Sequence, residues 1–116
     1  MQPQFRLLTD GQRAQLVTAY SVTARGRVWV VPAGFVTDWA SVPRFLWPMI
    51  PPMGRWSVPA LVHDYLYRTH IVPRAEADAV FLELMRRHGT NCFTRNIIFR
   101  AVRLFGGVAW RRHHGG

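Results

Sequence analysis

The segment best suited to chemistry in this chain is His63-Asp64-Tyr65-Leu66-Tyr67. On a helix, residues four positions apart lie on the same face, so His63 and Tyr67 would point the same way. Asp64 would lie about 100° around the helix axis from His63. An imidazole whose ring is oriented by a carboxylate can act as a base for water or a hydroxyl group. The spacing therefore makes His63 the candidate base, with Tyr67 beside it on the same face.

Asp78 is the second residue of interest. In a helix over this region it lies within about 60° of the centre of an apolar stripe that includes Phe81 and Met85. A carboxylate near a buried face needs a partner, because burying it unpaired costs several kcal/mol. We expect that partner to be His63 or a nearby arginine. A His63–Asp78 pair would supply the base and orienting group of a hydrolytic site, or it would only link two helices.

Two further carboxylates could hold a cation. Asp64 and Asp38, together with backbone carbonyls, offer the oxygen ligands that Ca²⁺ prefers. Such an ion could polarise a carbonyl group and stabilise an oxyanion. The alternative for Asp38 is local, because an Asp before a turn often accepts hydrogen bonds from nearby backbone amides. Calcium is the one cofactor that these residues suggest, and the sequence leaves open whether any is bound.

The elements that must position these residues begin with strands. Residues 15–23 and 27–32 are rich in Val, Thr, Tyr and Trp, and the short Ala24-Arg25-Gly26 segment between them predicts a hairpin. Residues 34–37 form a further extended piece. Residues 41–59 contain five prolines, which exclude a long helix and predict an ordered loop rich in Pro and Trp.

Three helices are predicted in the second half of the chain. They run from Ser57 to about Tyr67, from Pro73 to about His88, and from a cap at Thr94 to a stop at Gly106-Gly107. The helical spacing places one set of residues inward and another outward. The inward set is Val80, Phe81, Leu84, Met85 and His88 in the second helix, and Ile98, Ala101, Val102 and Phe105 in the third; Arg100 and Arg103 face outward.

These elements predict an α+β fold: a small N-terminal antiparallel hairpin sheet, the Pro/Trp-rich loop, and three helices. The chain has 116 residues, enough for one domain, and we expect it to span residues 1–116. Residues 1–12 and 111–116 are expected to be poorly ordered or extended.

Composition excludes several classes of protein. No run approaches the roughly 18 apolar residues that a membrane-spanning helix needs. The first ten residues lack the apolar core of a secretory signal peptide. The single cysteine, Cys92, excludes an internal disulfide and a zinc cluster built from cysteines.

The chain carries a formal net charge of +9, and it contains arginine but no lysine. No Asp or Glu follows Glu83, whereas seven arginines do. This charge favours acidic protein surfaces, DNA or anionic lipid as partners of the C-terminal third. The alternative is a solvated helix face. No zinc-finger, helix-turn-helix or basic-zipper pattern is present.

The segment from Val31 to Arg44 (VPAGFVTDWASVPR) resembles a bacteriophage and prophage family, domain of unknown function 1353. The resemblance continues through Pro51–Gly54, the His63–Tyr67 segment, Arg74–Asp78 and Ala101–Trp110, and covers roughly residues 28–110. It implies a setting in tailed phages, prophages and gene-transfer elements, often near tail or lysis genes. It also implies a location in the virion, or in the bacterial cytoplasm before assembly.

A more distant similarity concerns the helix that carries His63, Asp64 and Tyr67. It resembles the His-Asp-x-Cys-Tyr helix of secreted phospholipases A2, and Asp78 could fill the role of the Asp on their second helix. The resemblance implies that His63 is the base for water, that Asp64 binds Ca²⁺, and that Asp78 orients His63. The cysteines and the glycine-rich calcium loop of that family are missing here.

Two functions follow as expectations. The first is a structural or interaction protein of a phage or gene-transfer particle, associated with the tail and bound to other particle proteins. The second is a small metal-dependent hydrolase that acts on lipid or cell-envelope bonds during entry or lysis. Whether the chain is an enzyme stays open at this point.

Overall fold

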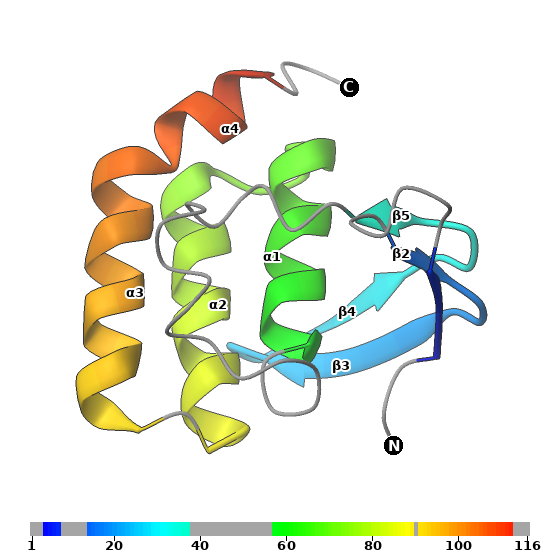
Figure 1. Ribbon diagram of the computed structural model, residues 1–116, viewed down its shortest axis with the longest axis horizontal. Coiled ribbons are helices and arrows are strands. Elements are labelled where there is room, and N and C mark those ends of the chain that lie inside the picture. The colour runs from blue at the N-terminus through cyan, green and yellow to red at the C-terminus, as the bar shows by residue number, and fades with distance from the viewer. Residues whose placement is uncertain (1–3, 8–13, 38–56, 90, 113–116) are drawn as a thin grey trace.

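Strands occupy the first part of the chain and helices the second in the computed structural model, which describes residues 4–7, 14–37, 57–89 and 91–112. The strands and helices of the described residues are β1 (Phe5–Leu7), β2 (Ala14–Leu16), β3 (Tyr20–Ala24), β4 (Arg27–Val31), β5 (Val36–Thr37), α1 (Ser57–Thr69), α2 (Arg74–Arg87), α3 (Cys92–Phe105) and α4 (Gly107–Arg112). The predicted α+β class and the order of strands before helices are confirmed (Figure 1).

The predicted hairpin consists of β3 and β4, which pair in antiparallel register from Tyr20↔Val31 to Ala24↔Arg27. Arg25 and Gly26 form its turn with φ angles of 50° and 75°. Two consecutive left-handed residues are the geometry of a tight hairpin turn whose twist matches that of the strands. Glycine adopts this conformation without strain, which explains why the short Gly-containing segment folds back here.

The expectation of one strand over residues 15–23 is wrong, because this segment contributes to two sheets. β2 is the middle strand of an antiparallel sheet with the order β1-β2-β5, whereas β3 pairs with β4. The backbone N–H of Val17 still donates to the carbonyl of Gln4, at 2.8 Å, and residues 17–19 then bend toward β3. Residues 15–23 are rich in Val, Thr and Tyr, within this bend as well as after it, so the composition did not indicate the break.

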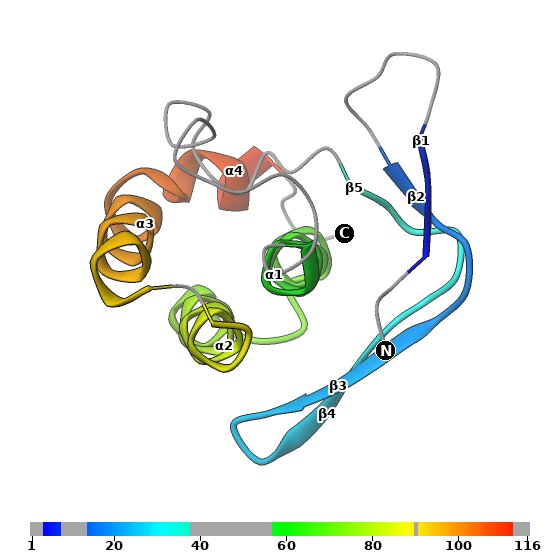
Figure 2. The ribbon, with the colours of Figure 1, turned by 60° about the horizontal axis from the view of Figure 1, so that its bottom comes forward.

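α1 lies between the strands and the other helices (Figures 1 and 2). It packs against β4 and β5 on one side and against α2 on the other, and α2 also contacts α3 and β3. The core fills these interfaces and contains large side chains from both halves of the chain: Leu16, Trp29, Val31, Leu61, Leu66, Tyr67, Phe81, Leu84, Met85 and Ile98. This packed core fixes the position of each helix. It therefore also fixes the positions from which the polar side chains of the helices extend.

The ends of the helices differ from the sequence-based expectation in two places. The backbone N–H of Thr94 donates to Oδ1 of Asn91 at 2.9 Å, so Asn91 caps α3 and Thr94 lies within its first turn. Phe105 is 55% exposed and was wrongly predicted to face inward. It is the last residue of α3, where the chain turns at Gly106 into α4 and leaves the apolar stripe.

α4 extends the helical region to Arg112 and is held by Trp110. The Trp110 ring stacks on His70 with a centroid distance of 3.7 Å, and its edge meets Tyr67 at 5.2 Å. Nε2 of His70 also lies 2.9 Å from the carbonyl oxygen of Trp110. The short helix α4 thus packs against the C-terminal end of α1. Within the residues described, no helix is long and apolar enough to cross a membrane.

Candidate functional site

The predicted His63–Asp78 pair forms at the interface between α1 and α2. Nε2 of His63 lies 2.8 Å from Oδ1 of Asp78, and both side chains are fully buried. Tyr67, one turn after His63, donates its hydroxyl to the same Oδ1 at 2.6 Å. The shared face of His63 and Tyr67 and the pairing of His63 with Asp78 agree with the sequence-based expectation, and the bond from Tyr67 to the same carboxylate is an additional contact.

Arg103 of α3 is the third donor to Asp78. Its Nη1 lies 2.6 Å from Oδ2 of Asp78. Arg103 was expected to face outward, and its backbone position does, but the long side chain reaches back into the interface with its head group part-buried. Asp78 consequently joins α1, α2 and α3, and both predicted kinds of partner, a histidine and an arginine, are present.

The charge state of Asp78 follows from these contacts. Burial alone would raise the pKa of Asp78, but the hydrogen bond and charge of His63, with the bonds from Tyr67 and Arg103, lower the pKa below its usual range. Asp78 is therefore ionised near neutral pH and only accepts hydrogen bonds, so Nε2 of His63 carries the proton in this contact. Burial and the adjacent Asp78 raise the pKa of Tyr67, which stays a neutral donor.

Aromatic rings enclose His63. The Phe81 ring stacks on the imidazole with a centroid distance of 4.3 Å, and the Tyr67 ring lies tilted at 4.2 Å. These contacts and the bond to Asp78 fix the ring orientation. An imidazole held in this way could serve as an oriented base, and it equally completes a fully packed helix interface.

Arg74 connects this group to the end of α3. Its Nε lies 3.1 Å from the Tyr67 hydroxyl, and its Nη2 lies 2.8 Å from the carbonyl oxygens of Val102 and Arg103. The last carbonyls of a helix lack partners within the helix, and a cation there is favourable. Arg74 therefore stabilises the C-terminus of α3 while it supports Tyr67.

Asp64 belongs to a second buried polar group, on the side of α1 that faces β5. The Thr37 hydroxyl donates to Oδ2 of Asp64 at 2.6 Å, and Nε of Arg68 lies 3.2 Å from the same oxygen. Asp64 is 1% exposed and Thr37 is fully buried. Each buried carboxylate of the helix pair is thus joined to an arginine.

Only part of the predicted calcium site belongs to the described residues. Asp38 lies outside the described residues, as does most of the 41–59 loop. In the described ranges, no three Asp, Glu, His or Cys side chains gather as a metal site would require. The described contacts of Asp64 include a hydroxyl and a guanidinium that donate to its carboxylate, so the described residues alone do not form a calcium site.

Sequence reasoning missed Arg103, Arg74 and Thr37. Arg74 stands four residues before Asp78, and this spacing was a usable signal because such residues are neighbours on a helix. Thr37 directly precedes Asp38, in a segment for which the sequence suggested bonds to nearby backbone amides or a cation ligand, but no bond to Asp64. Nothing local indicated Arg103, which is 25 residues from Asp78.

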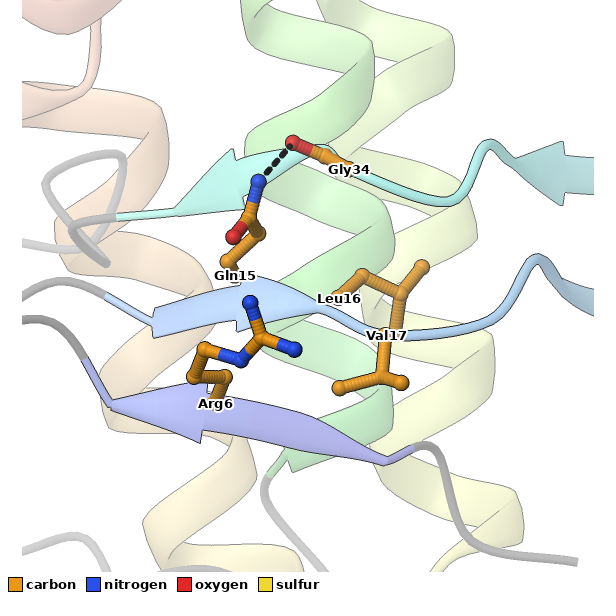
Figure 3. Close-up of a pocket in the computed structure, with 5 residues that line it drawn as sticks. All are labelled: Arg6, Gln15, Leu16, Val17 and Gly34. Atoms are coloured by element: carbon orange, nitrogen blue, oxygen red, sulfur yellow. Dashed lines mark hydrogen bonds between the residues drawn. The ribbon is translucent and has the colours of Figure 1, made fainter.

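A shallow hollow of about 160 Å³ lies away from these groups, on the sheet of β1, β2 and β5 (Figure 3). Its lining residues are Arg6, Gln15, Leu16, Val17 and Gly34. Nε2 of Gln15 donates to the carbonyl of Gly34 at 3.3 Å, and Arg6 extends from β1 toward Gln15. None of the residues predicted for chemistry lines it.

The outer surface of α3 and α4 combines apolar and basic side chains. The exposed residues there include Phe93, Leu104, Phe105, Val108, Arg100, Arg103 and Arg111. Their proximity on consecutive helices confirms that the basic C-terminal third presents arginines at the surface, and it adds large apolar groups beside them.

Comparison with known families shows a match over most of the chain. The model of the family described as "Protein of unknown function (DUF1353)" matches residues 14–102, from β2 to the last turns of α3. The matched range contains all of the residues predicted for the site, and it confirms the resemblance to domain of unknown function 1353. No curated protein and no solved structure matches the chain.

Proposed function

The chain belongs to the DUF1353 family, and on that premise we propose that it is a component of a phage or gene-transfer particle. Its role there is that of a tail-associated interaction protein. The setting is supported by the resemblance of the Val31–Arg44 segment and the later motifs to phage and prophage proteins. The partners are other particle proteins.

The observation that carries this proposal is the mixed apolar and basic surface of α3 and α4. Phe93 and Leu104 are 73% and 75% exposed, and Arg100 and Arg103 lie close to them in sequence. Protein interfaces are enriched in aromatic residues and arginine, which contribute much of the binding energy. A surface of this composition favours a protein that works by binding.

In this account the buried polar groups serve the fold. Asp78 accepts from His63, Tyr67 and Arg103, and Asp64 accepts from Thr37 and Arg68. Removing one partner from such a group leaves an uncompensated buried charge. The groups therefore fix α1, α2, α3 and β5 in the arrangement that presents the outer surface.

The test is to purify particles from the strain that encodes the chain and to count copies of the chain by quantitative mass spectrometry. We expect a constant number of copies per particle across independent preparations. A chain that is abundant in the lysate and absent from washed particles would refute the proposal.

A second candidate function is a small hydrolase of the metal-dependent kind, acting on lipid or cell-envelope ester bonds. The observation that favours it is the convergence of His63 and Tyr67 on Oδ1 of Asp78. It supports the roles that the phospholipase A2 resemblance implies, with His63 as the base for water and Asp78 as its orienting group. A calcium ion at Asp64 would have to compete with Arg68 for the carboxylate.

This candidate is tested by thermal melting with and without millimolar Ca²⁺, for the wild type and for Asp64→Asn, followed by an ester and phospholipid screen. If the chain is such a hydrolase, Ca²⁺ should raise the melting temperature of the wild type by several degrees, by mass action. The melting temperature of Asp64→Asn should not change. Such a hydrolase also requires that His63→Gln abolish hydrolysis without unfolding. If Ca²⁺ stabilises neither protein and no ester is cleaved, the hydrolase is excluded.

A further inference from the structure

One stripe of α3 is largely exposed. Phe93, Ile97, Arg100 and Leu104 are separated by four, three and four residues, a spacing that places them on one helix face within a span of about 60°. Phe93, Arg100 and Leu104 are exposed, and Ile97 is partly buried. We call these four residues the α3 stripe.

A different face of α3 makes the main contacts with the core. Ile98, Ala101 and Val102 are buried there, and α2 is the main neighbour of the helix. Figures 1 and 2 place α3 at the edge of the helical layer, with α2 between α3 and α1. Ile97 also packs against the core, whereas Phe93, Arg100 and Leu104 are exposed and are not required to hold α3 in place. Isolated exposed apolar residues are ordinary, but alternating four- and three-residue spacing is the pattern by which one helix packs against another.

The charge around the stripe limits what can cover it. Arg100 lies within the stripe and is exposed, whereas the charge of Arg103 beside it is paired with Asp78. No Asp or Glu follows Glu83 in the chain, whose net charge is +9. A second copy of the chain would bring arginine against arginine, which is unfavourable across an interface. Acidic side chains on the covering partner would complement this surface.

The position of Arg100 favours a helix over a lipid bilayer as the occupant. Arg100 separates the apolar pair Phe93 and Ile97 from Leu104 along the same face. Burial of this face in a bilayer would draw the guanidinium toward the apolar region, at a cost. In a helix pair, a carboxylate on the facing helix can pair with Arg100 while apolar residues meet those on either side.

We propose that the α3 stripe binds an amphipathic helix of an acidic partner protein, with a carboxylate facing Arg100. This inference rests on the proposed particle function, because it specifies the chemistry of the partner that the chain meets there. Phe93, Ile97 and Leu104 supply the apolar contacts, and Arg100 selects against basic partners.

The test uses three fluorescein-labelled synthetic helices with the same leucine stripe and with Glu, Gln or Lys at all flanking positions. Fluorescence anisotropy measures their binding to the folded full chain up to millimolar concentration. We expect the Glu peptide to bind at least about tenfold more tightly than the Lys peptide. Arg100→Glu should reverse that order. Leu104→Glu should weaken binding of the Glu peptide about tenfold or more, as loss of a large apolar contact at an interface does.

Val28→Glu is the matched control, because Val28 is 64% exposed on the hairpin, far from α3 in the chain. The proposal is overturned if no peptide binds, if the three peptides bind equally, or if Val28→Glu weakens binding as much as Leu104→Glu does. It is also overturned if only phosphatidylglycerol vesicles bind, or if Leu104→Glu dissociates a dimer in sedimentation. Any of these results, with the chain still present in particles, refutes the helix partner and leaves the particle function intact.

Discussion

Nε2 of His63 and Oδ1 of Asp78 lie 2.8 Å apart across the interface of α1 and α2, and neither side chain is exposed. Arg103 joins the same carboxylate from α3 at 2.6 Å. One ionised group therefore connects three helices. Its contribution to folding and any contribution to chemistry can be separated experimentally, because they respond differently to substitution.

Asp78→Asn should lower the free energy of unfolding by about 3–5 kcal/mol. The asparagine keeps the size of the side chain, but the NH₂ group of its amide would face a donor, either Arg103 or His63, where Asp78 has an accepting oxygen. Urea denaturation monitored by circular dichroism measures the change. The control is Glu83→Gln, since the Glu83–Arg87 pair is partly exposed and should contribute less than about 1 kcal/mol. Equal effects of the two substitutions would show that Asp78 is not a stabilising group.

Acid should destabilise the protein partly through Asp78. The pKa of Asp78 is lowered in the folded state, so its contribution to stability is present above the unfolded-state pKa of about 3.9. It is lost as the pH falls through the folded-state pKa. Melting temperatures measured from about pH 6 to pH 2 should therefore fall less steeply in Asp78→Asn than in the wild type. Parallel curves would contradict the assigned pKa shift.

Gly106→Ala should be destabilising because of space rather than backbone conformation. A Cβ at Gly106 would lie 2.5 Å from the carbonyl oxygen of Val102 and 2.9 Å from the Tyr67 hydroxyl. We expect a loss of about 1–3 kcal/mol in the free energy of unfolding. Gly107→Ala is the matched control, since its nearest neighbour would be 3.6 Å away, on Arg74, and alanine favours a helix. A neutral Gly106→Ala would mean that α4 does not approach Tyr67 as described.

Thr37→Val tests the second buried group. Valine has nearly the shape of threonine, but it cannot donate the 2.6 Å hydrogen bond to Oδ2 of Asp64. A buried carboxylate that loses a donor should cost about 1–3 kcal/mol, measured by urea denaturation. Thr23→Val, in the exposed part of β3, should change stability by no more than about 0.5 kcal/mol. Similar changes in stability for the two substitutions would show that the hydrogen bond from Thr37 to Asp64 does not stabilise the fold.

Local patterns predicted the parts of the fold that depend on local geometry. The β3–β4 hairpin follows from a turn containing Gly26, and α2 follows from the three- and four-residue spacing around Phe81. The same helical geometry predicted that His63 and Tyr67 would share a face and that Asp78 would need a partner. These features need only the periodicity of one element and the cost of an unpaired buried charge.

Contacts between distant segments could not be predicted in this way. Arg103 bonds Asp78 from 25 residues away, and Thr37 bonds Asp64 from 27 residues away. Periodicity gives the face on which a side chain begins, whereas the head group of a long arginine can reach around the helix. The break between β2 and β3 and the exposure of Phe105 were missed for a related reason. Both depend on where an element ends in the assembled structure.

The most direct test of this account compares Leu104→Glu with His63→Gln in particles of the encoding strain. Both proteins should remain folded, because Leu104 is on the surface and the glutamine amide can still donate to Asp78. The account predicts that Leu104→Glu lowers the number of copies per particle, measured by quantitative mass spectrometry, about tenfold. His63→Gln should be incorporated normally and support normal DNA transfer. Normal incorporation of Leu104→Glu, or particles that contain His63→Gln and fail to deliver DNA, would contradict the account.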